Sequence, residues 1–380
     1  MRIHLTGMLI AAGVLASLAG GTTQAQQPYK IGISAGMTGY GATIDRAWRD
    51  GVELAAAGLN EHGGVLGQKI EVITEDNRSE PQDAVTVYRK MISSDQVKVF
   101  ISGCVSAGNF AAAGIVIRAQ IPMVLCSILP PQPDQVKWAF SLLPPPRFEV
   151  EKRYQYLQAN TQIRTIGILH DPTPYATLQK NIGEKVAPDF GLTVAGIEQY
   201  KQDDADLSAQ ISKLKSQGAQ AIVKMGQGGS TLTAAKNIKQ LGLDIPLLAS
   251  VDDLAIFKPA GDALGDKFLF VAAPSQVYEA LPDGALKQEL GKFLPGWRAK
   301  YGERDPNWGG KGWDGMLITA AAVQKANAID GPKVRDAIET ISGFQGTGGV
   351  YNFAPAMHQG ITENPLVLGT ISNGNVKVVK

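Results

Sequence analysis

The residues best suited to bind a small molecule lie in two short polar runs, each placed after an apolar strand pattern. Residues 97–103 are rich in apolar and β-branched types and end in Gly, as a buried parallel strand does. The small polar residues 104–109 follow and open an Ala-rich helix. Its predicted N-cap is Ser106, because the hydroxyl can accept from a first-turn amide. A second strand pattern, 121–126, leads into the run 126–131.

These two runs are expected to meet at one edge of a parallel sheet. The unit has a β-loop-α-β pattern, whose crossover is right-handed, and such sheets bind ligands beyond the carboxyl ends of their strands. We therefore predict that residues 104–109, with Cys104, and residues 126–131 face a ligand. The free amides at the helix start can hold an anion.

Catalysis is a weak alternative for this chain. Gly32–Gly36 matches the G-x-S-x-G pattern that sets the nucleophile of serine hydrolases on a sharp strand-to-helix turn. Ser34 instead lies inside the first predicted strand, so a secreted serine hydrolase is the least favoured function. No two His or Cys residues stand at metal-ligand intervals, and no Walker-type phosphate loop occurs in the sequence. We predict no enzyme activity, no metal and no cofactor.

The first residues have the composition of a secretory signal. Residues 1–25 contain an early Arg, an apolar core at 8–19 and small residues before a predicted cleavage point after Ala25. The core is too short to span a bilayer as a permanent anchor. We therefore expect an exported, periplasmic protein that is not inserted in the membrane.

The charge balance limits which partners are expected, and the cysteine positions limit the redox states that the chain can adopt. Loss of the signal removes Arg2 from 36 basic residues, which leaves 35 against 35 acidic ones. This balance, without a basic block, disfavours nucleic acid as a partner. Cys104 and Cys126 are the two cysteines, and both end strands expected to be neighbours. They either form a disulfide, as exported proteins allow, or remain two small buried hydrophobic residues.

Strand and helix patterns alternate along the chain and predict an α/β fold of two doubly wound parallel-sheet lobes. The triple proline 144–146 is predicted to be a stiff connector at the first crossing between lobes, and Pro274 marks a second. The N-terminal lobe is predicted to comprise residues 28–143 plus 275–342. The C-terminal lobe is predicted to comprise 144–274 plus 343–380, the latter ending in strands around an Asn-Gly turn.

Several short motifs, in a fixed order, resemble one known family. They are Ile31-Gly-Ile with Gly39-Tyr-Gly41, Gly51-Val-Glu-Leu-Ala55, Asn60-Glu-His-Gly-Gly64, Asp76-Asn with Pro81, Gly103-Cys-Val-Ser-Ala-Gly108, Ile121-Pro-Met-Val124, His170-Asp171 with Tyr175, and Trp313-Asp314-Gly315. Together they resemble the periplasmic solute-binding proteins of ABC importers, in the branch of the leucine/isoleucine/valine-binding proteins. The resemblance implies the type I periplasmic binding fold, with two lobes, a hinge of three strand crossings and one small ligand in the cleft. It also implies an inner-membrane permease and ATPase as partners, and we expect a monomer.

The chain departs from the amino-acid binders of that family at the ligand loops. A Ser that holds the carboxylate in the family corresponds to Ser106 or Ala107 here. The next loop, usually Ser-Ala-Thr-like, corresponds to Ser127-Ile128-Leu129, with two apolar side chains. The acid for the ligand ammonium falls at Asp252 or Asp253, and Gly226–Gly229, with Gln227, stands where relatives carry Tyr. These changes imply a roomier and more apolar pocket.

Three further side chains are candidates for ligand contact. Tyr40 and Tyr175 lie on loops that should face the cleft from opposite lobes, either as flat walls against a ligand or as ordinary loop aromatics. Arg147 follows the triple proline, where it could pair with a ligand carboxylate or remain a solvated hinge charge.

The sequence therefore favours a periplasmic receptor that delivers a small carboxylate ligand to an ABC importer. The ligand is either a branched-chain amino acid or an acid with an aromatic or apolar body. The family name favours the first, and the apolar loop slightly favours the second. A sensory module that reports ligand to a membrane receptor is the alternative function.

Overall fold

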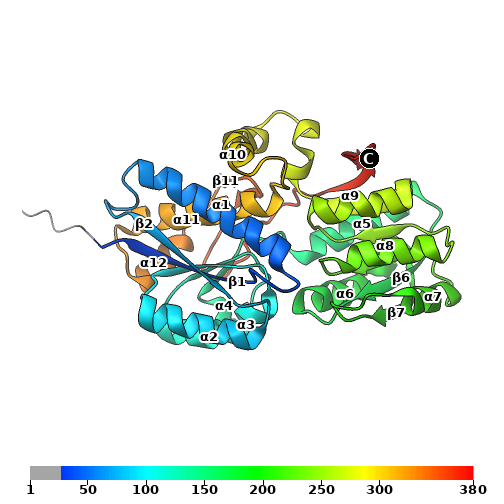
Figure 1. Cartoon of the computed structure of the whole chain (residues 1–380), viewed down its shortest axis with the longest axis horizontal. Helices are drawn as coiled ribbons and strands as arrows, with labels where there is room; N and C mark the ends of the chain where they lie inside the picture. Colours follow the sequence, from blue (N-terminus) through cyan, green and yellow to red (C-terminus); the bar gives the residue numbers. More distant parts are fainter. Residues whose placement is uncertain (1–26, 380) are drawn as a thin grey trace, which may run out of the picture.

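A computed structural model describes residues 27–379, so the predicted signal segment 1–25 lies outside the described residues. Figure 1 shows two lobes that lie side by side along the long axis of the molecule and are joined by connecting segments at a hinge. Each lobe has a central sheet covered by helices on both faces, as the sequence predicts. No described helix is long and apolar enough to cross a membrane.

The sheet of the N-terminal lobe is parallel and runs in the order β2-β1-β3-β4-β5. The residues of the central strands β1 and β3 are almost entirely buried, which explains why most of them are apolar. The strands are β1 (Tyr29–Ala35), β2 (Ile70–Asp76), β3 (Val99–Ser102), β4 (Met123–Leu125) and β5 (Ala139–Ser141).

Two helix pairs cover this sheet, one on each face (Figure 1). One face packs against α1 (Ala42–Glu61) and α11 (Asn307–Ala326), and the other against α2 (Pro81–Lys90) and α3 (Ser106–Ala119). A π-helical turn (Met91–Asp95) follows α2, and α4 (Pro133–Val136), α10 (Ala285–Tyr301) and α12 (Gly331–Ile338) are the remaining helices outside the C-terminal lobe.

Glycines let α1 and α11 cross at very short range. A Cβ on Gly51 would lie 1.8 Å from the carbonyl oxygen of Gly309, and a Cβ on Gly312 would lie 2.1 Å from that of Trp48. Any larger residue at these positions would push the helices apart. The crossing fixes the start of α11 beside the cleft between the lobes.

The sheet of the C-terminal lobe is mixed, in the order β14-β13-β10-β9-β8-β6-β7. Its first five strands in sequence are parallel. Of the two tail strands, β13 pairs antiparallel with β10, and β14 pairs antiparallel with β13. The strands are β6 (Thr165–His170), β7 (Thr193–Gln199), β8 (Ala221–Met225), β9 (Leu247–Ala249), β10 (Phe268–Ala272), β13 (Val367–Ser372) and β14 (Asn375–Val379).

Helices again cover both faces of this second sheet. They are α5 (Pro146–Asn160), α6 (Pro174–Val186), α7 (Ser208–Ser216), α8 (Ser230–Gln240) and α9 (Leu254–Leu264), with short 3₁₀ turns at Ala187–Phe190, Gly265–Lys267 and Pro274–Ala280. The aromatic side chains of Phe257, Phe268 and Phe270 stack where α9 meets β10. This packing fixes the start of α9, which faces the cleft.

The third connection between the lobes comes later than the sequence suggests. The hairpin of β11 (Phe344–Gly346) and β12 (Gly349–Tyr351) donates to Asp314 on α11, for example from the Tyr351 hydroxyl at 2.9 Å. The Ser141 amide donates to the His358 carbonyl at 2.8 Å, so this segment still belongs with the N-terminal sheet. We therefore propose a crossing at 362–366 instead of a lobe boundary at 343.

Two local predictions are wrong, and one helix is absent from the predictions. The triple proline is not a stiff connector throughout, because Pro146 begins α5, where a fixed φ and a missing N–H suit the first helical turn. The N-cap of α3 is Val105 and not Ser106, which is the first helical residue and makes no capping hydrogen bond. Helix α9 was not predicted, because Pro259 interrupts its pattern, although the structure keeps Pro259 inside the helix.

Candidate functional site

A cavity lies between the two lobes and is lined by residues of both. Its volume is about 560 Å³ when the solvent-filled mouth is included. The N-terminal lobe contributes Tyr40, Thr43, Ile44, Cys104, Val105 and Ser106. The C-terminal lobe contributes Thr173, Tyr175, Gln202, Gln227, Gly228, Gly229, Asp252 and Ile256.

The cavity lies where parallel strands end, as expected for this fold class. Cys104 follows β3 in the N-terminal lobe, while Thr173, Gln227 and Asp252 follow β6, β8 and β9 in the C-terminal lobe. The strand order places β6, β8 and β9 next to one another, so residues distant in sequence converge.

Six of the predicted ligand residues line this cavity: Tyr40, Cys104, Ser106, Tyr175, Gln227 and Asp252. Ligand contact by these side chains stays a prediction. Tyr40 is the most exposed of them, at 40%, and Tyr175 is 7% exposed. The two rings come from opposite lobes, so they can act as opposing walls.

The structure does not bring the other five predicted residues to the cavity. Ala107 lies in the first turn of α3, and Ser127 is buried, where its hydroxyl accepts from Asn109 at 3.0 Å. Ile128 is buried, and Leu129 packs against the core around α2 and α3. These apolar residues therefore belong to packing within the N-terminal lobe.

Arg147 also lies outside the cavity. It is exposed on the first turn of α5 and pairs with Glu151, one turn later in the same helix. Because Pro146 starts a helix here, the guanidinium points along the helix surface instead of into the cleft. Of the two alternatives for this residue, the structure supports the solvated charge.

A buried carboxylate holds the two cleft loops of the N-terminal lobe together. Asp45, on the first turn of α1, accepts from the backbone amides of Gly36 and Cys104, each at 2.5 Å. Burial raises the pKa of Asp45 to about 7, although the two amide hydrogen bonds oppose this. The first amides of α3, which follow Cys104, have no partner inside the helix and remain suited to an anion.

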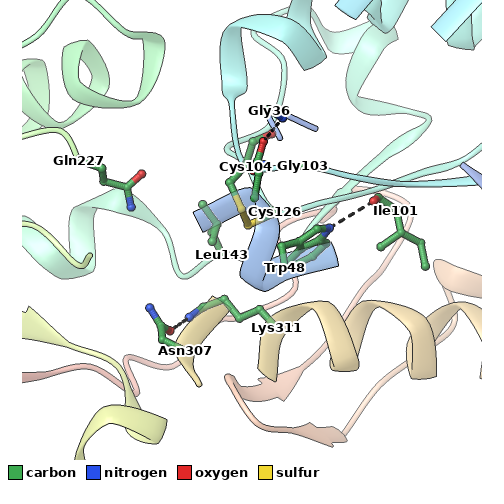
Figure 2. The surroundings of a disulfide bond; sticks show 12 residues. Gly36, Trp48, Ile101, Gly103, Cys104, Cys126, Leu143, Gln227, Asn307 and Lys311 are labelled. Carbon is green, nitrogen blue, oxygen red and sulfur yellow. Dashed lines mark hydrogen bonds between the residues drawn. A yellow bond between two sulfur atoms is a disulfide. The ribbon is translucent and has the colours of Figure 1, made fainter. Parts of the chain in front are cut away.

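The structure joins Cys104 and Cys126 in a disulfide, with Cα atoms 4.4 Å apart. Figure 2 shows the bond beside Leu143, with Gln227 of the C-terminal lobe across from it. The two cysteines follow the neighbouring strands β3 and β4, so the bond ties together the loops at their carboxyl ends. Cys104 itself lines the cavity.

The Tyr175 ring is held from behind by a buried network. Its hydroxyl donates to Glu149 Oε1, and Glu149 Oε2 accepts from the Val251 amide at 2.8 Å. Burial raises the pKa of Glu149, while the neighbouring Arg153 opposes that shift. With its hydroxyl engaged by Glu149, Tyr175 can offer mainly its ring to a ligand.

Asp252 gives the C-terminal wall of the cavity its charge. Its carboxylate accepts from the amides of Gly228 at 2.6 Å and Asp253 at 2.8 Å. Burial raises the pKa of Asp252 to about 6, and Lys224 nearby is among the groups that oppose the shift. Among the described residues that line the cavity, Asp252 is the only one with an acidic or basic side chain of the Asp, Glu, Lys or Arg type. This wall therefore suits a positively charged group.

Sequence reasoning missed several lining residues. Gln202 follows β7, and its Nε2 donates to Asp171 Oδ2 at 2.9 Å, which fixes the amide beside the cavity. Its position after a strand end was a usable signal. Ile256 lies on α9, which was not predicted, so no signal pointed to it.

Ser34 does not have the surroundings of a hydrolase nucleophile. It is buried within β1, where it pairs with Glu75 of β2, and its hydroxyl accepts from Asn77 Nδ2 at 3.1 Å. A nucleophile elbow would require a sharp turn directly before a helix.

Comparison with known proteins gives one consistent result. A family model described as periplasmic binding protein matches residues 28–375. The leucine-, isoleucine-, valine-, threonine-, and alanine-binding protein of Pseudomonas aeruginosa is 25% identical over 357 residues, which are 91% of this chain and 93% of that protein.

Solved structures show the same fold. An extracellular ligand-binding receptor from Rhodopseudomonas palustris HaA2 superposes with a TM-score of 0.85 at 22% identity, covering 93% of this chain and 100% of the other. The substrate-binding protein LivJ of a branched-chain amino acid transporter from Streptococcus pneumoniae, solved with isoleucine, gives 0.77 at 21% identity, covering 93% and 99%.

Proposed function

Because the chain belongs to the periplasmic binding protein family, in its leucine-, isoleucine- and valine-binding branch, we propose that it is the solute-binding component of an ABC importer. The family implies a periplasmic or extracellular location. In this role the protein binds one small carboxylate ligand between its lobes and presents the closed form to a permease and its ATPase. The observation that carries the proposal is the cavity with walls from both lobes.

The two walls of the cavity offer opposite electrostatic environments. The N-terminal wall has the free amides at the start of α3, which favour a carboxylate, with the Ser106 hydroxyl beside them. The C-terminal wall has the Asp252 carboxylate, which favours an ammonium. A zwitterion matches both walls, whereas an acid without an amine offers no positive charge to Asp252. This favours an amino acid with an apolar side chain, against the slight preference of the sequence for an aromatic acid.

The apolar part of the ligand has suitable partners in the same cavity. Ile44 and Val105 come from the N-terminal lobe, Ile256 comes from α9, and Tyr40 and Tyr175 add ring surfaces. Burial of a branched side chain contributes about 1.5–3 kcal/mol. Closure of the lobes increases this burial, so the ligand shifts the open–closed equilibrium by its preference for the closed state.

A calorimetric panel tests the proposal. Leucine, isoleucine and valine should bind the mature protein with heat, and benzoate and phenylacetate should bind at least about tenfold more weakly, a difference of about 1.4 kcal/mol. Tight binding of an aromatic acid with no response to the amino acids would reject the amino-acid assignment but keep the solute-binding role. No response to any small carboxylate would reject the proposed ligand class.

A further inference from the structure

Helix α11 begins with three buried side chains that carry hydrogen-bond donors, Asn307, Trp308 and Lys311. We name them the α11 donor cluster. Lys311 is 3% exposed, and Asn307 and Trp308 are 1% exposed each. The Lys311 ammonium donates to Asn307 Oδ1 and lies 5.0 Å from the centroid of the Trp308 ring. Burial of a lysine ammonium is costly unless acceptors or counter-charges surround it.

The donors of this cluster lack acceptors. Asn307 Nδ2 and Trp308 Nε1 have no hydrogen-bond partner within residues 27–379. Lys311 has one hydrogen-bond partner in the same part of the chain, so further ammonium hydrogens remain free, and none of its described neighbours forms an ion pair with it. Buried donors are nearly always paired, so two unpaired donors beside one incompletely paired ammonium indicate a position for an acceptor.

The acidic side chains that act electrostatically on Lys311 accept their hydrogen bonds from other donors. Asp305, Asp314 and Glu149 act on it electrostatically. The Asp305 carboxylate accepts hydrogen bonds from three donors, that of Asp314 from four and that of Glu149 from two. None of these donors is a side chain of the donor cluster, although one is the backbone amide of Asn307. Burial lowers the pKa of Lys311 to about 8, so its ammonium is still mostly charged at neutral pH.

The cluster lies on the hinge side of the cleft. One turn further along α11, a Cβ on Gly315 would lie 3.2 Å from Ile101 and 3.3 Å from Leu142, so α11 packs there against the carboxyl ends of the N-terminal strands. Lys311 therefore extends past the sheet edge. Figure 2 shows Asn307 and Lys311 on the cleft side of α11, near Leu143 and opposite Gln227 of the C-terminal lobe.

We propose that the α11 donor cluster is an anion subsite on the hinge side of the cleft, which holds a carboxylate group or a small inorganic anion. This goes beyond the proposed function, because none of the three residues lines the cavity described above. The anion is either the carboxylate of the bound ligand, held here instead of at the amides of α3, or a free ion from solvent. In both cases the Lys311 ammonium and the Asn307 amide donate to it.

Thermal unfolding of the mature protein without ligand tests the subsite. Chloride or acetate replaces the bulky sulfonate MES at constant ionic strength and pH 7. The wild-type Tm should rise saturably by at least about 2 °C in chloride or acetate. Lys311→Met should abolish this rise, and Lys236→Met, which removes an exposed lysine of α8, should retain it.

Crystals grown with bromide give a second measurement that needs no variant. An anomalous peak is expected within hydrogen-bond distance of Lys311 Nζ and Asn307 Nδ2. The proposal is overturned if wild-type Tm is equal in all three anions, or if water alone occupies the position in bromide crystals. Either result alone is sufficient.

The same crystals distinguish the two sources of the anion. If the ligand supplies it, an added ligand that binds the cleft displaces bromide, and Lys311→Met weakens its binding at least about tenfold. If the ion is separate, bromide and ligand are present together. A protein that binds none of the proposed ligands but still shows bromide-dependent density would reject the transport ligand and retain the anion subsite.

Discussion

At the scale of single residues, buried carboxylates define the two sides of the cleft differently. Asp45 uses its oxygens to hold backbone amides of two loops and does not line the cavity, whereas Asp252 accepts two backbone amides and also lines the cavity. Both have a pKa raised by burial, to about 7 and about 6. Asp45 is therefore a positioning residue, and Asp252 is the candidate for direct ligand contact.

Asp252→Asn should lower leucine affinity by about 10- to 150-fold, because a charge-assisted hydrogen bond contributes about 1.5–3 kcal/mol. Calorimetry at pH 7 measures the loss. Asp203→Asn, which changes an exposed acid outside the cavity, is the control and should bind as the wild type does. Unchanged leucine affinity in Asp252→Asn would rule out Asp252 as the ammonium acceptor.

The raised pKa of Asp252 also predicts a pH dependence. Its folded pKa of about 6 lies above its model value of 3.8, so the folded protein binds this proton more tightly than the unfolded chain. The contribution of this group to stability therefore falls as pH rises from about 4 to about 6. Leucine affinity should change in the opposite direction and decrease as pH falls below about 6, a trend that Asp252→Asn should remove.

The disulfide is a second prediction at this scale. Unfolded, unreduced mature protein should contain no thiol that reacts with a thiol reagent, and prior reduction should release two, from Cys104 and Cys126. Reduction should also weaken ligand binding, since Cys104 lines the cavity directly before α3. Two reactive thiols without reduction would instead support the alternative of two free buried cysteines.

At the scale of elements, the close crossing of α1 and α11 positions the N-terminal wall of the cleft. The first turn of α1 carries Asp45, and the first turns of α11 carry the donor cluster. A change of distance between the two helices would therefore move both groups relative to the strand ends.

Gly51→Ala should destabilise the protein by about 2–3 kcal/mol, because the new Cβ would lie 1.8 Å from the Gly309 carbonyl oxygen. Gly58→Ala in the same helix is the matched control, since a Cβ there has nothing within 4 Å. It should be neutral or stabilise by up to about 1 kcal/mol through helix propensity. Urea unfolding measures both, and equal effects would contradict the close-crossing explanation.

The elements also show where sequence reasoning succeeds and where it is insufficient. Buried parallel strands are predictable because both faces are covered, which gives continuous apolar runs such as 99–101 and 268–272. Helix α9 is not, because Pro259 breaks the local pattern while its aromatic packing keeps the helix intact. Contact of Arg147 with a ligand carboxylate is not supported, for a related reason. The local sequence places Arg147 near the hinge, but the direction of its side chain depends on the start of α5 at Pro146.

The candidate site was predictable to the extent that strand ends determine it. Cys104, Gln227 and Asp252 follow predicted strands, and the parallel topology brings them to one cavity. Ile128 and Leu129 also follow a predicted strand, yet Ile128 is buried outside the cavity lining and Leu129 packs against the core around α2 and α3. Which side a loop residue faces depends on packing between distant elements, which a single sequence does not contain. Lys311 lies on a helix far from these loops, so no local signal pointed to it.

At the scale of the whole molecule, the cavity exists because two lobes meet. Gly228 of the C-terminal lobe lies close to Tyr40 of the N-terminal lobe, since a Cβ on Gly228 would be 3.8 Å from the Tyr40 carbonyl oxygen. The hinge-side hydrogen bond from the Leu254 amide to Asp305, at 2.7 Å, also joins the start of α9 to the segment before α11. These two contacts join the lobes, so they stabilise the closed arrangement and are lost when the lobes separate.

Ligand should therefore compact the protein in solution. Small-angle scattering is expected to show a smaller radius of gyration with saturating leucine than without it, because the ligand favours the closed lobes. Asp252→Asn at the same leucine concentration should show the larger value, whereas Asp203→Asn should compact. Identical scattering of wild type with and without a ligand that calorimetry shows to bind would exclude closure as the response.

The late return of the backbone to the C-terminal lobe affects how the protein can be divided. Residues 344–361 contact α11 and β5 in the N-terminal lobe, and only then does β13 pair with β10 and β14 with β13. Neither lobe is thus a single continuous stretch of the chain. A protease that cuts one connecting segment would leave two fragments that still pack against each other, because α11 covers the N-terminal sheet and β13 and β14 complete the C-terminal sheet. Nicked protein should therefore migrate as one particle under native conditions and separate only in denaturant.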